Sequence, residues 1–97
     1  TVRLASPLRD VYKRQVLDYL ELSDEHSIVE IIANKKIDGH SLIELDIRAK
    51  FGLNIVAIKR GKEVIVSPRA TENIQAGDIL IVIGHDDEVD RFKHFLR

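Results

Sequence analysis

Residues 41–60 read SLIELDIRAKFGLNIVAIKR, a pattern that predicts an amphipathic helix followed by a strand. Ser41 and Glu44 are spaced as in a capping box, in which each side chain accepts a hydrogen bond from the other residue's backbone N–H. Gly52 is typical of the left-handed residue that ends a helix. We therefore expect a helix over residues 41–51 and a strand over residues 53–59.

The predicted helix has two apolar stripes. Leu42, Leu45 and Ala49 recur at the spacing of a stripe that faces a core. The second stripe consists of Ile43, Ile47 and Phe51. We expect the first stripe to build the domain and the second to face a partner subunit and a ligand, since a small domain has few other surfaces to cover it. The alternative is that the second stripe folds into a curved core beneath a loop.

The rest of the chain alternates apolar runs with turn residues. Strands are predicted at residues 16–22, 27–33, 63–67 and 78–84, and a final helix begins at residue 86. Asp86 is the expected N-cap of this helix. Gly61 predicts a type II′ hairpin turn, and the nearly continuous apolar run DILIVIG predicts a strand that is buried on both faces. The predicted fold is α+β, a small mostly antiparallel sheet with two helices in the order β-β-α-β-β-β-α.

The first fifteen residues differ from the remainder. They show no clear periodicity, and their last six, DVYKRQ, match the translation of one frame of a transposon adapter used in sequencing libraries. We interpret residues 1–15 as a leader that is non-native or disordered and exclude it from the fold. Residues 16–97 are then expected to form a single domain, as the length of the chain suggests.

Composition excludes several classes of function. Of 97 residues, 44% are hydrophobic and 32% are charged, the net charge is −1, and there is no cysteine. No apolar run is long enough to cross a bilayer, so we expect no direct membrane insertion. The near-neutral charge and the 5% of aromatic residues argue against nucleic acid as a partner.

Chemistry-bearing motifs are scarce. The four histidines do not stand at zinc-site spacing with a carboxylate. Asp86, Asp87 and Glu88 fit a helix cap and first turn better than a metal site. No nucleophile elbow, P-loop or GxGxxG motif occurs. We therefore expect no enzymatic activity, no cofactor and no metal.

Three polar residues beside the apolar stripes could read a ligand. Asp46 is expected at the edge of the core, where it would accept hydrogen bonds or read an exocyclic amine. Arg48 offers a planar fork that suits phosphate, and Asn54 offers a donor and an acceptor, as an adenine edge requires. Around a two-fold axis they would suit a symmetric ligand with two bases and two phosphates. The alternative roles are a cap, an ion pair and a strand-edge amide.

Four segments carry a family resemblance: VLDYLELSDEHSIVEI, GHSLIELDIRAKFGLNIVAIKRG, EVIVSP and AGDILIVIG. From residue 16 onward the chain resembles the TrkA-C type domain, the C-terminal domain of regulators of potassium conductance (RCK), as found in cytoplasmic gating-ring subunits of bacterial Ktr potassium transporters. The resemblance implies a homodimer through residues 41–54 that binds cyclic di-AMP at its interface and down-regulates potassium uptake. It also implies a cytoplasmic protein at the inner face of the plasma membrane, whose full-length form contacts a membrane transporter subunit.

The resemblance also assigns site residues. The implied apolar walls are Leu42, Ile43, Ile47, Pro68 and Ala70. Asp46 and Asn54 would contact the bases, and Arg48 the phosphate. The chain departs from the family pattern where Ala70 replaces a frequent proline and His40 a frequent lysine. The N-terminal Rossmann half is missing, so we expect no ATP, ADP or dinucleotide binding through that motif, and no complete ring. The alternative function is a structural dimerisation module of a transporter or antiporter regulator, with no ligand or a different one.

Overall fold

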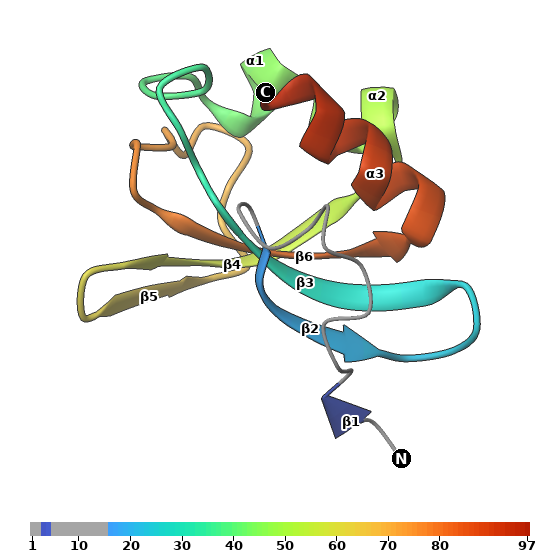
Figure 1. Cartoon of the computed structure of the whole chain (residues 1–97). Coiled ribbons are helices and arrows are strands. Elements are labelled where there is room, and N and C mark those ends of the chain that lie inside the picture. The colour runs from blue at the N-terminus through green and yellow to red at the C-terminus, as the bar shows by residue number, and fades with distance from the viewer. Residues whose placement is uncertain (1–2, 5–15) are drawn as a thin grey trace.

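The computed structural model describes residues 3–4 and 16–97, with side chains from Leu20 onward. Its centre is an antiparallel sheet of six strands in the order β1-β2-β3-β6-β4-β5 (Figure 1). The strands are β1 (Arg3–Leu4), β2 (Val16–Glu21), β3 (His26–Ile32), β4 (Asn54–Arg60), β5 (Glu63–Val66) and β6 (Ile79–His85). The two-residue β1 pairs with β2 and lies within the leader that was excluded from the predicted fold. The remaining leader residues lie outside the described part of the chain.

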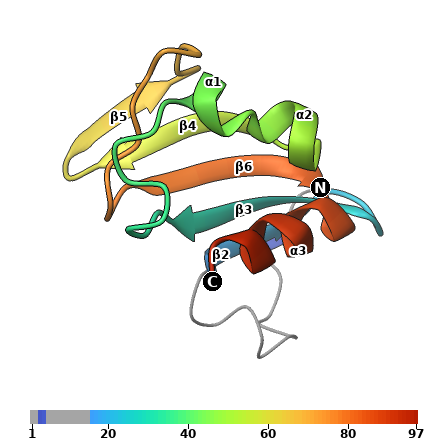
Figure 2. The ribbon, with the colours of Figure 1, turned by 90° about the horizontal axis from the view of Figure 1, so that it is seen from above.

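Three helices cover one side of this sheet. They are α1 (Leu42–Leu45), α2 (Ile47–Phe51) and α3 (Asp86–Phe95), and Figures 1 and 2 show all three on the same face. The core lies between the helices and the central strands, where Val29 and Ile31 of β3 and Leu80 and Val82 of β6 are fully buried. The α+β class and the element order from β2 onward are confirmed.

The apolar strand β6 is buried on only one face. Leu80 and Val82 are fully buried, whereas Ile79, Ile81 and Ile83 are half-buried. Among the described elements, no helix lies on the second face of the sheet (Figure 1). The prediction that this strand is buried on both faces is therefore wrong. An unbroken apolar run does not distinguish the two situations, because it has no polar positions to mark an exposed face.

The predicted helix over residues 41–51 is divided at Asp46. Its N-terminus forms as expected, since the Glu44 N–H donates to Ser41 Oγ at 3.2 Å and the Ser41 N–H donates to Glu44 Oε1 at 2.9 Å. Its C-cap also forms at Gly52, with φ of 74°. Between them, Asp46 has φ of 50° and ψ of 44°, a left-handed conformation that aspartate tolerates better than most residues. The prediction of one continuous helix is wrong.

This break changes which residues face the core. Ile47 is only 4% exposed, and the Phe51 ring lies 5.3 Å from the rings of Phe92 and Phe95, measured between centroids. Ile43 is 65% exposed, and Ala49 of the expected core stripe is also exposed. The second stripe is therefore not a free face, and Ile43 alone of its three residues is exposed. The rotation at Asp46 turns the residues after it toward α3.

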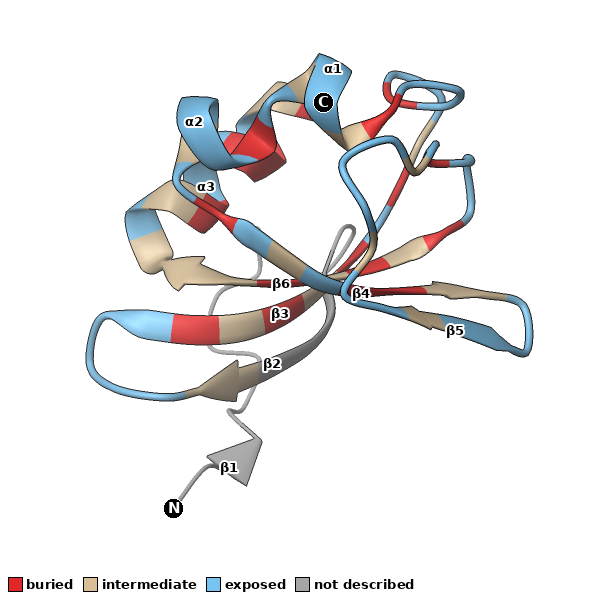
Figure 3. Cartoon of the chain, turned by 180° about the vertical axis from the view of Figure 1, so that it is seen from behind, coloured by how far each residue is buried: buried red, intermediate tan, exposed pale blue. Residues whose placement is uncertain are grey.

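The β4–β5 hairpin follows its predicted turn chemistry. Arg60 and Glu63 are paired across a two-residue turn, in which Gly61 has φ of 61° and Lys62 is not left-handed. Figure 3 shows β5 as mostly exposed at the edge of the sheet. After the hairpin, residues 67–77 form the loop that contacts α1.

Candidate ligand-binding site

The loop that follows β5 lies directly against α1. The Leu42 N–H donates to the Glu72 carbonyl at 3.1 Å, and the Ile43 N–H donates to the Ala70 carbonyl at 2.9 Å. The first N–H groups of a helix have no partner within the helix, so the loop satisfies them. The structure thus brings Leu42 next to Glu72 and Ile43 next to Ala70.

A buried ion pair anchors the far end of this loop. Asp78 is 2% exposed, and its two carboxylate oxygens accept hydrogen bonds from Arg60 Nε at 2.9 Å and Arg60 Nη2 at 2.8 Å. Arg60 Nη2 also donates to the Asn73 carbonyl at 2.9 Å, and the Gln75 N–H donates to Asp78 Oδ2 at 2.9 Å. One guanidinium therefore ties the hairpin to both the loop and β6.

The surroundings of this pair shift its ionisation. Burial by itself raises the pKa of Asp78, but hydrogen bonds from Arg60 and Gln75 outweigh burial, so the pKa of Asp78 lies below its usual value. The hydrogen bond to Asp78 likewise raises the pKa of Arg60. Sequence reasoning missed both residues as supports of the site. An aspartate at the start of an apolar strand indicates a buried partner, but nothing local identifies Arg60 as that partner.

Two residues other than glycine adopt a left-handed backbone within the described part of the chain, and both lie at the candidate site. They are Asp46, at the α1–α2 junction, and Ser67, which precedes Pro68; both have φ of 50°. Such conformations cost about 1 kcal/mol or more and persist where surrounding contacts impose them. Ser67 is held by its N–H, which donates to the Val56 carbonyl at 2.9 Å. The two strained backbone positions therefore lie in the region where the sequence predicts ligand contacts.

The three predicted polar residues are all exposed. Asp46 lies at the junction, Arg48 in α2 and Asn54 at the start of β4. Asp46 makes no side-chain cap, so the expectation that it is part-buried and hydrogen-bonded is wrong. Within the described residues, these three side chains have no hydrogen-bond or ion-pair partner in the domain. They are available to a ligand or to another subunit.

The predicted apolar walls differ in exposure. Ile43 and Ala70 are exposed, Leu42 and Pro68 are half-buried, and Ile47 is part of the core. Ile47 can therefore present at most a small edge of its side chain. Among the predicted wall residues, Ile43 is the large hydrophobic side chain most exposed to solvent, so it is the wall residue most accessible to a ligand or a partner.

Comparison with known proteins shows the family of the chain. The family model described as the TrkA-C domain matches residues 26–97, which is most of the described chain. The chain belongs to the TrkA-C domain family. This is a family of regulatory domains and not of enzymes, in agreement with the sequence-based prediction.

Curated relatives of this TrkA-C domain belong to potassium uptake systems. Ktr system potassium uptake protein C of Bacillus subtilis (strain 168) is 59% identical over 98 residues, which cover 93% of this chain and 44% of that protein. Ktr system potassium uptake protein A of the same organism is 41% identical over 93 residues, which cover 96% of this chain and 40% of that protein. The chain thus spans less than half the length of these relatives.

Solved structures give the same family. The RCK C domain of the potassium transport protein KtrA, in complex with cyclic diadenosine monophosphate, matches with a TM-score of 0.71 and 59% identity, over 75% of this chain and 86% of that one. A dimer of the RCK_C domain of BusR from S. agalactiae, also in complex with cyclic di-AMP, matches with a TM-score of 0.66 and 32% identity, over 71% of this chain and 88% of that one. None of the described helices of the TrkA-C domain is long and apolar enough to cross a membrane.

Proposed function

We propose that this TrkA-C domain dimerises through residues 41–54 and binds cyclic di-AMP at the dimer interface, and that binding down-regulates a Ktr-type potassium uptake system. One observation carries the proposal. Three exposed polar side chains have no partner within the described domain and lie at or near the strained α1–α2 junction: Asp46, Arg48 and Asn54. The chain that carries them is 59% identical to a domain solved with that ligand.

Each residue has a chemical role in this proposal. The Arg48 guanidinium donates to a phosphate of the ligand, since its planar fork matches phosphate oxygens. The Asp46 carboxylate accepts from the adenine amino group, and the Asn54 amide pairs with the adenine edge. Leu42, Ile43, Pro68, Ala70 and the edge of Ile47 form the apolar walls.

The second subunit completes the site. Cyclic di-AMP has two adenines and two phosphates related by a two-fold axis, so a two-fold dimer presents each binding residue to it twice. Binding across the interface then favours the dimer arrangement that the ligand fits, and the transporter responds to that arrangement. In the full-length protein the domain acts in the cytoplasm, at the inner face of the plasma membrane, through a membrane potassium transporter subunit.

Calorimetric titration of the chain with cyclic di-AMP tests the proposal. We expect one ligand per dimer, and we expect Arg48→Ala to weaken binding about 10- to 100-fold through loss of a charged hydrogen bond to phosphate. Lys50→Ala is the matched control, because Lys50 is an exposed cation of the same helix. Absence of binding by the intact chain would refute the proposal, and an equal loss in both variants would remove Arg48 from the site.

The exposure of Ile43 also fits a second function, a dimerisation module that needs no ligand or a different one. In that case Ile43→Asp separates the dimer, and cyclic di-AMP leaves the melting temperature of the unmodified chain unchanged. Ile43 is the appropriate position because Ile47 is buried, so a charge at Ile47 would unfold the domain. Sedimentation velocity with and without cyclic di-AMP distinguishes the two functions.

A further inference from the structure

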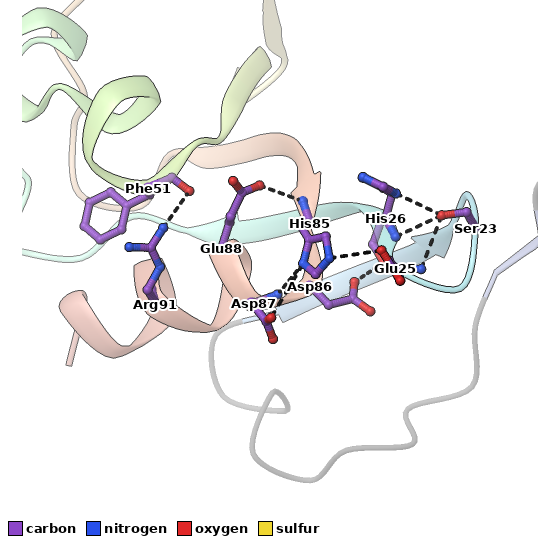
Figure 4. A network of polar contacts seen from close by, with 10 residues as sticks. Ser23, Glu25, His26, Phe51, His85, Asp86, Asp87, Glu88 and Arg91 are labelled. Carbon is purple, nitrogen blue, oxygen red and sulfur yellow. Dashed lines mark hydrogen bonds and ion pairs between the residues drawn. The ribbon is translucent and has the colours of Figure 1, made fainter.

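Two histidines meet at the end of the sheet where α3 begins. His26 of β3 is paired in register with His85 of β6, and their rings pack edge to face, with centroids 5.4 Å apart (Figure 4). His85 is the N-cap of α3, with φ of −73° and ψ of 146°. The prediction that Asp86 caps this helix is therefore wrong by one residue, and the cap is an imidazole side chain.

Two hydrogen bonds determine the protonation state that this cap requires. The Asp87 N–H donates to His85 Nδ1 at 3.2 Å, so Nδ1 carries no proton. The proton of the neutral ring is then on Nε2, which lies 3.3 Å from Glu25 Oε2 and donates to it. A doubly protonated imidazolium has two N–H groups and no acceptor, so it cannot cap Asp87.

Five charged or titratable residues surround His85, and three of them, Glu25, His26 and Asp87, contact its ring. Glu25 comes from the β2–β3 turn, His26 from β3, and the remaining three from the first turn of α3: Asp86, Asp87 and Glu88. The Asp86 carboxylate accepts from Ser27 Oγ at 2.8 Å, and the Glu88 carboxylate accepts from the His85 N–H at 2.9 Å. The Asp87 carboxylate lies 3.8 Å from His85 Nδ1. A proton on Nδ1 would therefore turn the ring from the Asp87 backbone toward the Asp87 side chain.

The first two turns of α3 also hold the end of α2. The Glu88 carboxylate lies so close to Gly52 that a β-carbon there would be 2.0 Å from Glu88 Oε2. Arg91 Nη2 donates to the Phe51 carbonyl at 3.4 Å (Figure 4). Because α2 carries Arg48, the His85 cap is linked through Glu88 and Arg91 to the proposed ligand site.

We propose that protonation of His85 removes the cap of α3, loosens the turn that holds α2, and so weakens ligand binding at acidic pH. The inference rests on the proposed cyclic di-AMP site for its effect on binding, but the loss of the cap does not depend on any ligand. The domain would then respond to both proton and ligand.

A first experiment follows the cap without ligand. In ¹H–¹⁵N spectra recorded between pH 8 and pH 5.5, we expect the Asp87 amide to shift together with the His85 ring. We also expect the protection factors of the Phe51 and Gly52 amides, corrected for the intrinsic pH dependence of amide exchange, to fall on acidification. His85→Asn keeps a capping side chain that does not titrate, so both changes should vanish. His85→Ser is the second non-titrating variant. An Asp87 amide that does not follow the His85 ring would overturn the proposal.

A second experiment measures cyclic di-AMP affinity at pH 8 and pH 5.5. We expect the unmodified chain to bind about fivefold more weakly at pH 5.5, the size of effect that loss of a helix cap produces, and His85→Asn to retain its affinity. His94→Asn, at the other end of α3, is the control and should behave like the unmodified chain. An equal loss in His85→Asn and the unmodified chain would overturn the link. If neither the unmodified chain nor His85→Asn binds cyclic di-AMP at either pH, the proposed function fails. The ¹H–¹⁵N spectra of the first experiment then test the loss of the cap by themselves.

Discussion

The helical segment formed by α1 and α2 has two contrasting sides. Toward the sheet, Ile47 is 4% exposed and lies in the continuous core. Away from it, Ile43 is 65% exposed, and the side chains of Asp46 and Arg48 have no partner among the described residues of the domain. The inward side contributes to folding stability, whereas the outward side is free to bind. The left-handed residue Asp46 joins the two, because it turns the chain so that Ile47 points inward.

The largest expected effect lies on the inward side. Ile47→Ala should lower the free energy of unfolding by about 2–5 kcal/mol, since it removes buried methylene groups and leaves a cavity. The same change at the exposed Ile43 should alter stability by less than about 0.5 kcal/mol. Urea unfolding of both variants measures the difference. Similar losses at the two positions would show that the contrast between the sides is wrong.

An intermediate effect is expected at the ion pair that anchors the loop. Asp78→Asn should lower the free energy of unfolding by about 2 kcal/mol, because it weakens buried hydrogen bonds to a charged group. The pKa of Asp78 is lowered in the folded state, so its ionisation stabilises the fold above the unfolded pKa of about 4, and this contribution is lost as pH falls through the folded value.

The acid dependence provides the check on Asp78. Unfolding free energies measured from pH 6 down to pH 2.5 should fall more steeply for the unmodified chain than for Asp78→Asn. Asp24→Asn, which removes an exposed carboxylate at the β2–β3 turn, is the control and should follow the unmodified chain. Parallel curves for all three would mean that the Arg60–Asp78 pair does not stabilise the fold through charge.

The smallest effect is expected at the joint between the two sides. Asp46→Gly should raise the unfolding free energy by about 0.5 kcal/mol, because glycine adopts the left-handed conformation without a steric penalty but has more freedom in the unfolded chain. Asp46→Ala should lower it by about 1 kcal/mol. Thermal unfolding of both variants measures this. If the Asp46 carboxylate accepts a hydrogen bond from the adenine amino group, both variants should also bind cyclic di-AMP more weakly, although they change stability in opposite directions.

The two helix caps show how far sequence reasoning reaches. Ser41 and Glu44 were predictable because serine is a frequent N-cap and its partner is three residues away. His85 and Glu88 form a similar reciprocal cap, but histidine is not among the usual N-caps, and the adjacent Asp86 gave a stronger local signal. The role of Arg60 could not be predicted, because its partner Asp78 is distant in the chain.

Sequence alone determined the elements whose signals are local: the apolar run of β3, the capped start of α1, the glycine end of α2, the β4–β5 turn, and the family resemblance. Tertiary structure alone decided the break at Asp46, the burial of Ile47, the pairing of residues 70–73 with α1 and the half-buried second face of the sheet. The physical reason is how far apart in the chain the interacting residues lie. Caps and turns are satisfied within a few residues, whereas the direction in which a helix turns depends on the aromatic rings and the loop that pack against it from distant parts of the chain.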